Sequence, residues 1–182
     1  MPRWYLLLLA LAGAQRLQEM AVSRRHERQV EGRRAASRSF PLMVGVHVAL
    51  FTLPPLEVAG LRRRSRAPVL WISLLGAATA LRLWSIRSLG RSWNVHSVVP
   101  SDLRPVEVGP YRWIRHPNYL AVVVEFLALP LAGGAWLSAL GLSALNAIVL
   151  LDRIRDEERL LREVPGYKEA FGRKARFIPG IF

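Results

Sequence analysis

Apolar stretches alternate with short charged segments along the whole chain. In the first half the apolar stretches cover residues 4–14, 40–56 and 67–86, and the one charge inside the third is Arg82. An arginine one turn from a helix end can extend its charged group to the membrane surface, so Arg82 does not break the pattern. Apolar runs of this kind, bounded by charge, predict membrane helices.

The first stretch has two interpretations. Residues 12–14 read Ala-Gly-Ala, as at a signal-peptidase site, so a cleaved signal peptide stays open. The helical pattern nevertheless continues through Leu17, Met20 and Val22, with polar residues between them. We favour a retained first helix that becomes amphipathic toward the cytoplasm.

Residues 118–151 hold a single charge, Glu125, in 34 positions. One helix of that length would be about 50 Å long, whereas the hydrocarbon core of a bilayer is roughly 30 Å thick. Pro130 and the pair Gly133-Gly134 lie near the middle of the stretch. We therefore predict a helical hairpin that turns at residues 131–135, with both of its ends on the same side of the membrane.

Together these segments predict an all-α protein, a polytopic integral membrane helix bundle with about five transmembrane helices. Residues 152–162 extend the last span as a charged amphipathic helix, which Pro165-Gly166 ends. Five spans put the two termini on opposite sides of the membrane. We expect residues 87–117 and 152–182 on the cytoplasmic side.

The basic loops agree only partly with that topology. The loop 23–39 carries six arginines and lies on the cytoplasmic side, as the positive-inside rule requires. The loop 61–67 carries four arginines and falls on the outer side, against the rule. This conflict leaves open that the third stretch or the first helix does not cross fully.

Composition narrows the class of protein. The chain has 26 basic and 13 acidic side chains, a net charge of +13, yet 52% of it is hydrophobic. The excess is +11 in residues 1–100 and +2 in residues 101–182. No RNA-binding motif or DNA-reading helix accompanies the basic runs, so we expect membrane lipids rather than nucleic acid as their partners. The absence of cysteine excludes disulfides and thiolate nucleophiles, and we expect no metal site.

Candidate chemistry gathers in the segment before the hairpin. Arg115 and His116 precede Pro117, which suits the first turn of a helix, so both lie at a positive helix end where an anionic group is favoured. Tyr111 and Tyr119 add aromatic faces on either side. Such rings suit either the membrane interface or stacking on a heterocycle.

These residues carry a resemblance. The second half of the chain contains, in order, Gly109-x-Tyr111-x-x-x-Arg115-His116-Pro117-x-Tyr119, a hydrophobic hairpin, Arg153-x-x-x-Glu157-Glu158, Gly166-Tyr167-x-x-x-Phe171 and Arg176-Phe177-Ile178-Pro179. This order of motifs resembles the isoprenylcysteine carboxyl methyltransferase family. Its members are membrane-embedded enzymes that use S-adenosylmethionine. The resemblance covers residues 85–182. The Arg-His-Pro-x-Tyr core alone also occurs in phospholipid methyltransferases and some membrane sterol reductases.

The N-terminal half is similar to a bacterial branch of that family. The similarity rests on Arg16-Leu17-x-Glu19, Ser23-x-Arg25-His26-Glu27 and Pro41-x-Met43-Val44-x-x-His47. That branch accompanies type III polyketide synthases and O-methylates alkylpyrones or alkylresorcinols. The resemblance therefore implies a lipophilic small-molecule acceptor, and a possible place in a type III polyketide synthase pathway.

The resemblance also implies that the two parts of the chain have different functions. Residues 1–87 would be the membrane anchor, helices one to three, and residues 88–182 the catalytic part with a cytoplasmic cofactor pocket. The S-adenosylmethionine contacts that it implies are His96, Leu103, Val106, Tyr111, His116, Pro117, Asn118, Tyr119 and Glu157. Leu103 stands where the family usually has histidine, which weakens the case for side-chain contacts at 103–106. The multi-pass protein would lie in the inner membrane with its active site facing the cytoplasm.

The catalytic and acceptor-binding candidates are Glu125, Arg153, His116, His47 and Asn146. A carboxylate in an apolar hairpin is costly, so Glu125 is a candidate general base for a hydroxyl acceptor. Its structural alternative is a pairing with His47, Arg82 or Asn146. The family resemblance implies that Arg153 positions the acceptor, and its alternative is an ion pair with Glu157 one turn away.

The resulting expectation is an S-adenosylmethionine-dependent O-methyltransferase of a lipophilic acceptor. Two alternatives stay open, a phospholipid N-methyltransferase and an NADPH-dependent membrane reductase of similar fold. A further alternative is a non-catalytic membrane protein with the same fold.

Overall fold

A computed structural model describes residues 1–29, 32–34, 39–100 and 103–178. Its long helices are α1 (Arg3–Gln29), α2 (Phe40–Gly60), α3 (Pro68–Leu89), α4 (Pro117–Gly133) and α5 (Trp136–Leu161). The shorter elements are β1 (Gly32–Arg34), η1 (Gly90–Ser92), β2 (Val98–Pro100), η2 (Gly109–Arg112) and α6 (Tyr167–Phe171). Residue Pro179 of the predicted tail motif lies outside the described residues.

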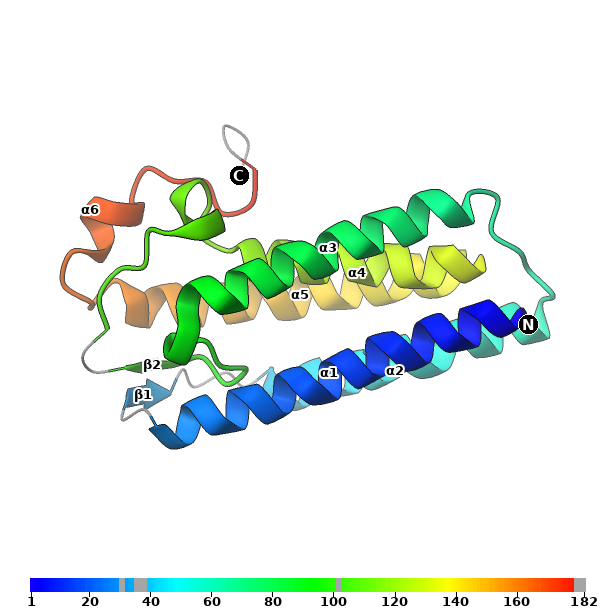
Figure 1. The fold of residues 1–182 in the computed structure, drawn as a ribbon, viewed down its shortest axis with the longest axis horizontal. Coiled ribbons are helices and arrows are strands. Elements are labelled where there is room, and N and C mark those ends of the chain that lie inside the picture. The colour runs from blue at the N-terminus through cyan, green and yellow to red at the C-terminus, as the bar shows by residue number, and fades with distance from the viewer. Residues whose placement is uncertain (30–31, 35–38, 101–102, 179–182) are drawn as a thin grey trace.

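The five long helices lie side by side and alternate in direction (Figure 1). One end of the bundle holds the N-terminus, the α2–α3 loop and the α4–α5 turn. The other end holds every short element (Figure 1). The predicted all-α membrane helix bundle is confirmed, and the segments with candidate chemistry gather at one end, called here the polar end.

Three of the described helices are long and apolar enough to cross a membrane: Phe40–Gly60, Pro68–Ser92 and Trp136–Leu161. The α4 helix is apolar but has only 17 residues. The α1 helix is not among them, because polar residues fill its second half. The expected number of about five spans is therefore supported directly for three helices.

Two helix ends test the boundary predictions. The predicted hairpin turn is confirmed, because α4 ends at Gly133 and Gly134 adopts φ +97° before α5 begins. Only glycine takes that left-handed conformation without strain. The α2 helix passes through Pro54 and Pro55 and continues to Gly60, beyond the apolar stretch of residues 40–56. Membrane helices tolerate internal proline when neighbouring groups accommodate the freed carbonyls.

The core lies between α4 and the helices around it. Its fully buried side chains include Tyr5 of α1, Leu50 of α2, and Phe126 and Leu129 of α4. Many leucine and valine side chains on the outer faces of the helices are exposed. Such an apolar exterior is expected of helices that face lipid rather than water.

A small antiparallel sheet closes the polar end. Strand β1 pairs with β2 in the register Gly32 to Pro100 and Arg34 to Val98. The hydrophobicity pattern contains no signal for this pairing, because both strands are only three residues long. The sheet joins the connection after α1 to the loop after α3, so the two halves of the chain meet at this end.

Candidate active site

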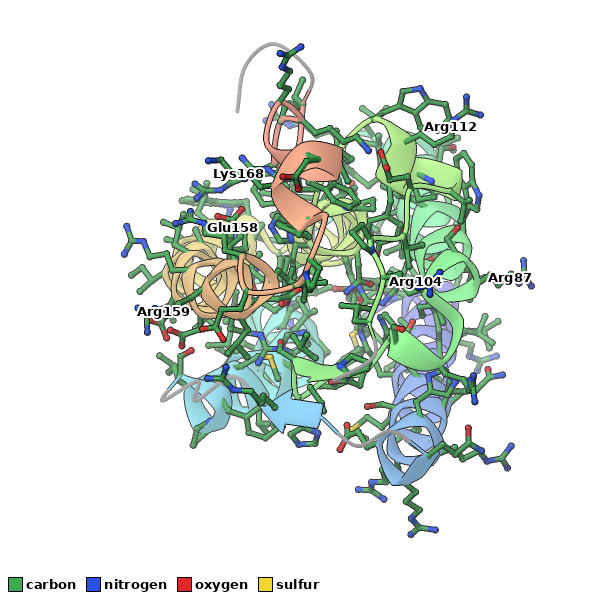
Figure 2. All side chains as sticks on the ribbon, turned by 90° about the vertical axis from the view of Figure 1, so that its left-hand side faces the viewer. Arg87, Arg104, Arg112, Glu158, Arg159 and Lys168 are labelled. Carbon is green, nitrogen blue, oxygen red and sulfur yellow. The ribbon has the colours of Figure 1, made fainter. Side chains whose placement is uncertain are left out.

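A pocket opens at the polar end of the bundle. Figure 2 views this end along the helices, with Arg87, Arg112 and Arg159 pointing outward and Arg104 nearer the centre. The pocket is lined by Leu89, Ser92, Trp93, Asn94, Ser97, Val98, Val99, Pro100, Leu103, Arg104, Pro105, Val106, Tyr111, Arg115, His116, Asn118, Tyr119, Glu157, Leu161, Tyr167 and Phe171. Its empty volume is about 840 Å³, part of it open to solvent.

One wall of the pocket is the turn that precedes α4. Gly109 adopts φ +58° and lies so close to α3 that a Cβ atom there would be 2.1 Å from Ser88 Oγ. This close approach places the η2 turn against α3 and buries Tyr111 beside the pocket. Burial raises the pKa of the Tyr111 phenol, and Glu157 adds to the effect, so the hydroxyl stays neutral.

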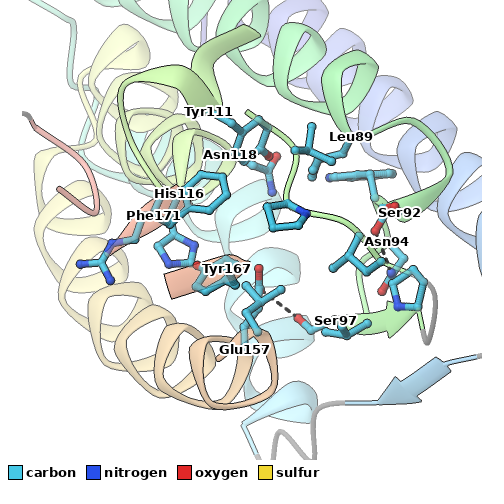
Figure 3. A pocket seen from close by; sticks show the side chains of 18 of the residues that line it. Leu89, Ser92, Asn94, Ser97, Tyr111, His116, Asn118, Glu157, Tyr167 and Phe171 are labelled. Atoms are coloured by element: carbon cyan, nitrogen blue, oxygen red, sulfur yellow. Dashed lines mark hydrogen bonds between the residues drawn. The ribbon is translucent and has the colours of Figure 1, made fainter. Parts of the chain in front are cut away.

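Glu157 lies on the α5 side of the pocket, between Tyr167 and Ser97 (Figure 3). Its Oε2 atom accepts hydrogen bonds from Tyr119 Oη at 2.5 Å and from Ser97 Oγ at 3.2 Å. These donors come from α4 and from the loop before β2, so one carboxylate joins three parts of the chain. Its second carboxylate oxygen accepts no hydrogen bond from the described residues and is available to a ligand.

Arg153 lies one turn before Glu157 and supports the same loop. Its Nη2 atom donates to Val95 O at 2.7 Å and to Ser97 Oγ at 2.9 Å. The side chain is 4% exposed, and its Nε and Nη1 atoms have no hydrogen-bond partner within the described part of the chain. A buried guanidinium with two unused donors favours an anionic or carbonyl group of a ligand.

Glu158, the residue after Glu157, faces away from the pocket and holds the C-terminal tail. It accepts hydrogen bonds from His116 Nε2 at 3.1 Å and from Arg176 Nη2 at 2.8 Å, and Arg115 Nη1 lies at 3.2 Å. The backbone adds two bonds, from the Arg115 amide to Ala175 O and from the His116 amide to Arg176 O. Glu158 therefore fixes the start of α4 against the tail, and the His116 ring is oriented by it.

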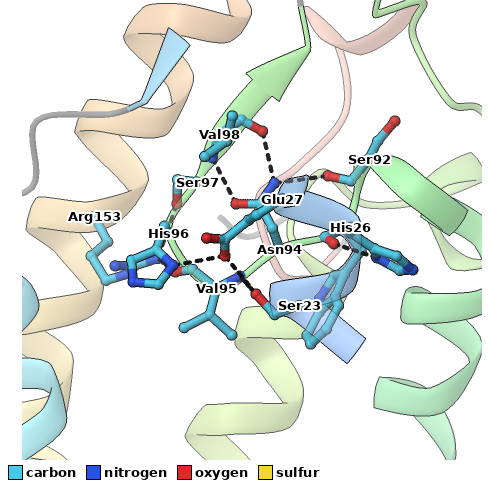
Figure 4. Close-up of polar contacts among 11 residues, drawn as sticks. Ser23, His26, Glu27, Ser92, Asn94, Val95, His96, Ser97, Val98 and Arg153 are labelled. Carbon is cyan, nitrogen blue, oxygen red and sulfur yellow. Dashed lines mark hydrogen bonds and ion pairs between the residues drawn. The ribbon is translucent and has the colours of Figure 1, made fainter. Parts of the chain in front are cut away.

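The C-terminal end of α1 holds the loop on the other side of the pocket (Figure 4). Glu27 accepts from Ser23 Oγ and pairs with His96 Nδ1, both at 2.7 Å. The Ser23 hydroxyl in turn accepts from the Val95 amide, and His26 Nδ1 lies 2.7 Å from Trp93 O. The first helix thus positions residues 93–97, although it contributes none of the pocket lining.

Glu125 lies deeper, inside the bundle. It is eight residues beyond Pro117, about 12 Å along the helix. Arg16 of α1 pairs with it closely, and Arg82 Nη1 of α3 lies 3.6 Å from its Oε2 atom. Glu19 completes the group, at 2.7 Å from Arg16 Nη1 and 2.9 Å from Arg82 Nε. The structural alternative of a pairing with Arg82 is thus present, together with a second arginine that the sequence did not indicate.

The structure brings most of the predicted cofactor residues together. Leu103, Val106, Tyr111, His116, Asn118, Tyr119 and Glu157 all line the pocket. Pro117 is the buried first residue of α4 beside them. His96 points instead to Glu27 and stacks on Phe40, with ring centroids 4.6 Å apart.

The remaining predicted residues lie apart from the pocket lining. His47 of α2 hydrogen-bonds to Met43 O of its own helix and meets the Phe126 ring edge-on. Asn146 is buried on α5. Their predicted contact with an acceptor, like the division of the chain at residue 87, stays a prediction.

Several pocket residues were missed by sequence reasoning. Trp93, Ser97, Tyr167 and Phe171 line the cavity. Tyr167 and Phe171 belong to the predicted tail motif, but nothing in the spacing indicates that the tail folds back onto the start of α4. Burial raises the pKa of Tyr167, with Glu157 and Glu158 adding to the effect.

The fold and the pocket define an integral membrane protein that presents a small-molecule site at one end of a helix bundle. The model of the isoprenylcysteine carboxyl methyltransferase (ICMT) family matches residues 71–163. The uncharacterized protein YpbQ of Bacillus subtilis (strain 168) is 33% identical over 161 residues, which cover 86% of this chain and 96% of that protein. The chain belongs to the isoprenylcysteine carboxyl methyltransferase family, whose members are membrane methyltransferases.

Methyltransferases of this family use S-adenosylmethionine in general, and the pocket residues fit that molecule. Asn118 Oδ1 is a buried acceptor, and Arg115 Nε a buried donor, with no partner among the described residues. They suit the ammonium and the carboxylate of an amino-acid moiety. Tyr111 and Tyr167 offer aromatic faces for an adenine, and the second oxygen of Glu157 suits ribose hydroxyls.

Proposed function

We propose that this protein is an S-adenosylmethionine-dependent O-methyltransferase of a lipophilic acceptor, of the alkylpyrone, alkylresorcinol or isoprenylcysteine-carboxylate type. Bound S-adenosylmethionine supplies an electrophilic methyl group, which the acceptor oxygen takes as the sulfonium becomes a thioether. The chain's own residues bind both molecules, orient them and exclude water.

The observation that carries this proposal is the arrangement of Glu157 and Arg153 on one face of α5. Glu157 belongs to the pocket, and Arg153 lies one turn closer to the membrane-embedded part of the same helix. An amphiphilic acceptor that enters from the lipid meets Arg153 before it reaches the pocket. The two unused donors of Arg153 would hold its oxygen in line with a cofactor bound beside Glu157.

The role of Glu125 decides between two kinds of acceptor. A neutral hydroxyl needs a general base, whereas a carboxylate needs none. Arg16 and Arg82 both pair with Glu125, which supports the structural pairing over the role of a free general base. We favour an acceptor oxygen that is already ionised when it meets Arg153.

We also propose a location in the cell and a source for the acceptor. The polar end would face the cytoplasm, where S-adenosylmethionine is made, and the bundle would lie in the inner membrane. A type III polyketide synthase pathway is the proposed source of the acceptor. A neighbouring gene for such an enzyme would support this, and its absence from the genome would count against it.

Cofactor binding is the first test. Calorimetry on the detergent-purified protein should show binding of S-adenosylmethionine and none of NADPH. Binding of NADPH alone would instead favour the reductase, and binding of neither would contradict the proposal. Phospholipid N-methylation is tested by the product, since labelled methyl groups should not enter phosphatidylethanolamine.

Glu157→Gln tests the site itself. It removes the charge that Tyr119 and Ser97 surround, and we expect about a tenfold loss of S-adenosylmethionine affinity, the loss of roughly one charge-assisted hydrogen bond. Glu169→Gln is the matched control, because Glu169 is an exposed acid on α6 with the same charge and size. Equal affinities for the two variants would contradict the role of Glu157.

Glu125→Gln, compared with Glu19→Gln, tests the general base. Both variants remove one carboxylate from the same buried group, but only Glu125 is a candidate base. Rates are compared per folded protein, on a neutral alkylresorcinol and on a carboxylate acceptor. Full activity of Glu125→Gln on the neutral phenol excludes the base role. A loss confined to that phenol and to that variant would establish it.

A further inference from the structure

The opposite end of the bundle carries a second cavity, which the proposed function does not use. It lies between the start of α1, the end of α2 and the start of α3, and has an empty volume of about 1330 Å³, part of it open to solvent. Arg62, Arg63, Arg64 and Ser65 of the α2–α3 loop line it. This is the loop whose charge conflicts with the positive-inside rule.

The charge in this cavity is not compensated. None of Arg62, Arg63, Arg64 and Arg66 forms an ion pair with a described residue. The carboxylate of Glu57, at this end of α2, is occupied by the Leu137 and Ser138 amides and the Ser138 hydroxyl. Residues 1–14, 58–81 and 126–151 contain no acidic side chain at all. Three arginines therefore line one cavity, and none of them is paired with a carboxylate among the described residues.

The cavity is built from well-defined parts rather than from a loose loop. Gly134, in the α4–α5 turn, lies against the loop backbone, where a Cβ atom would be 2.6 Å from Arg64 C. The Arg63 guanidinium lies over the Trp136 ring at 4.9 Å from its centroid. Arg62 adopts φ +49°, a conformation that non-glycine residues rarely take and that recurs at ligand sites. Ser65 Oγ is buried without a partner among the described residues.

The helices and side chains around the cavity indicate which kind of anion it would bind. The loop connects two helices that are long and apolar enough to span a membrane, so it lies at the level of the lipid headgroups. Leu56, Leu61 and Val69 next to it are 67%, 52% and 75% exposed. Trp4 and Trp136, rings of the kind found at membrane interfaces, are both 42% exposed at this end.

We propose that this cavity binds the phosphodiester headgroup of an anionic phospholipid. The guanidinium groups and the Ser65 hydroxyl would donate to the phosphate oxygens, and the acyl chains would lie along the exposed apolar residues beside the loop. The single negative charge of such a lipid would offset part of the charge of the four arginines, and so reduce the conflict of this loop with the positive-inside rule, because the arginines would face a bound anion rather than the outer solution.

Native mass spectrometry of the full chain in neutral detergent tests this with phosphatidylglycerol and phosphatidylcholine as probes. We expect phosphatidylglycerol to bind at least about tenfold more tightly, and the variant Arg62→Gln/Arg63→Gln/Arg64→Gln to lose that preference. The matched control is Arg24→Gln/Arg25→Gln/Arg28→Gln, which removes three exposed charges at the other end and should keep it. Equal binding of the two lipids, or an equal loss in both variants, would overturn the proposal.

Two further experiments use the unaltered protein and need no variant. Hydrogen exchange of residues 61–67 in the unaltered protein should slow with phosphatidylglycerol and not with phosphatidylcholine; no change with either would overturn the site. Glycerol 3-phosphate should not displace the lipid at equal concentration, and if it did, the cavity would be a site for free phosphate. None of these readouts needs S-adenosylmethionine, so their outcome is independent of the methyltransferase proposal.

Discussion

Glu125 and Glu158 are both buried carboxylates among arginines, yet their surroundings differ in charge balance. Inside the bundle, Glu125 and Glu19 face Arg16 and Arg82, two acids against two bases. At the polar end, Glu158 alone faces several cations: Arg115, Arg176, the more distant Arg162 at 3.7 Å, and His116 when protonated. The interior group is neutral, whereas the group at the polar end has an excess of positive charge.

The difference follows from the solvent. No water screens a charge in the bundle interior, so an unmatched arginine there would be very costly. At the polar end the arginine partners of Glu158 reach water; Arg162 is 70% exposed and Arg176 is 26% exposed. An excess of positive charge is tolerated there, beside the pocket that is proposed to bind an amino-acid carboxylate.

The largest expected effect is therefore in the interior. Glu125→Gln leaves Arg16 and Arg82 with one carboxylate between them, which should destabilise the protein by about 3–5 kcal/mol. Thermal unfolding in detergent, followed by circular dichroism, measures the loss. The double variant Arg16→Met/Glu125→Leu is the control, because an apolar replacement of a buried pair is often neutral. If the double variant were no more stable than Glu125→Gln, the pairing would not be the cause.

A smaller effect is expected at the polar end. Glu158→Gln weakens charge-assisted hydrogen bonds to His116 and Arg176, and should cost about 2–3 kcal/mol. The tail should also detach locally, so limited proteolysis should cleave within residues 172–178 sooner than in the unaltered protein. Unchanged protection of that segment would show that the backbone bonds at Ala175 and Arg176 hold the tail without Glu158.

Arg176→Gln sharpens the comparison, because it removes one of several cations around Glu158. The others remain, so the loss should be about 1 kcal/mol, well below that of Glu158→Gln. Thermal unfolding of both variants under the same conditions makes the comparison. Equal losses would mean that the Arg176 pair, rather than the whole group, stabilises this end.

The smallest effect belongs to the exposed pair of Arg33 and Glu163. Their side chains are 71% and 54% exposed, so water and salt screen the attraction. Arg33→Gln should change the free energy of unfolding by less than about 0.5 kcal/mol. A loss comparable to that of Arg176→Gln would show that this pair fixes strand β1 against the segment that follows α5.

Sequence reasoning identified the pocket lining well where the residues are close in sequence. Tyr111, His116, Asn118 and Tyr119 were found because the motif and the start of α4 are local features. The choice of Glu157 rather than Glu158 as a cofactor contact came from the family resemblance, because spacing alone does not separate the two. Neighbouring residues on a helix point about 100° apart, and only the position of the tail shows which one faces the pocket.

Contacts between distant segments were the main omission. Arg16 and Glu125 are 109 positions apart, and neither hydropathy nor spacing pairs them. The same holds for the contacts of Ser23 and Glu27 with residues 95–96, which make the first helix part of the support of the site. The predicted division into an anchor and a catalytic part does not include these contacts.

The pattern of apolar runs, glycine and proline was enough to establish a membrane helix bundle and the hairpin turn, because these depend on local geometry and on the cost of exposing backbone to lipid. The motif order was enough to indicate the family. Tertiary structure alone showed which charges neutralise one another, that the tail returns to the start of α4, and that the arginines of residues 62–64 line a cavity. Such pairings depend on distance in space, which a linear pattern does not contain.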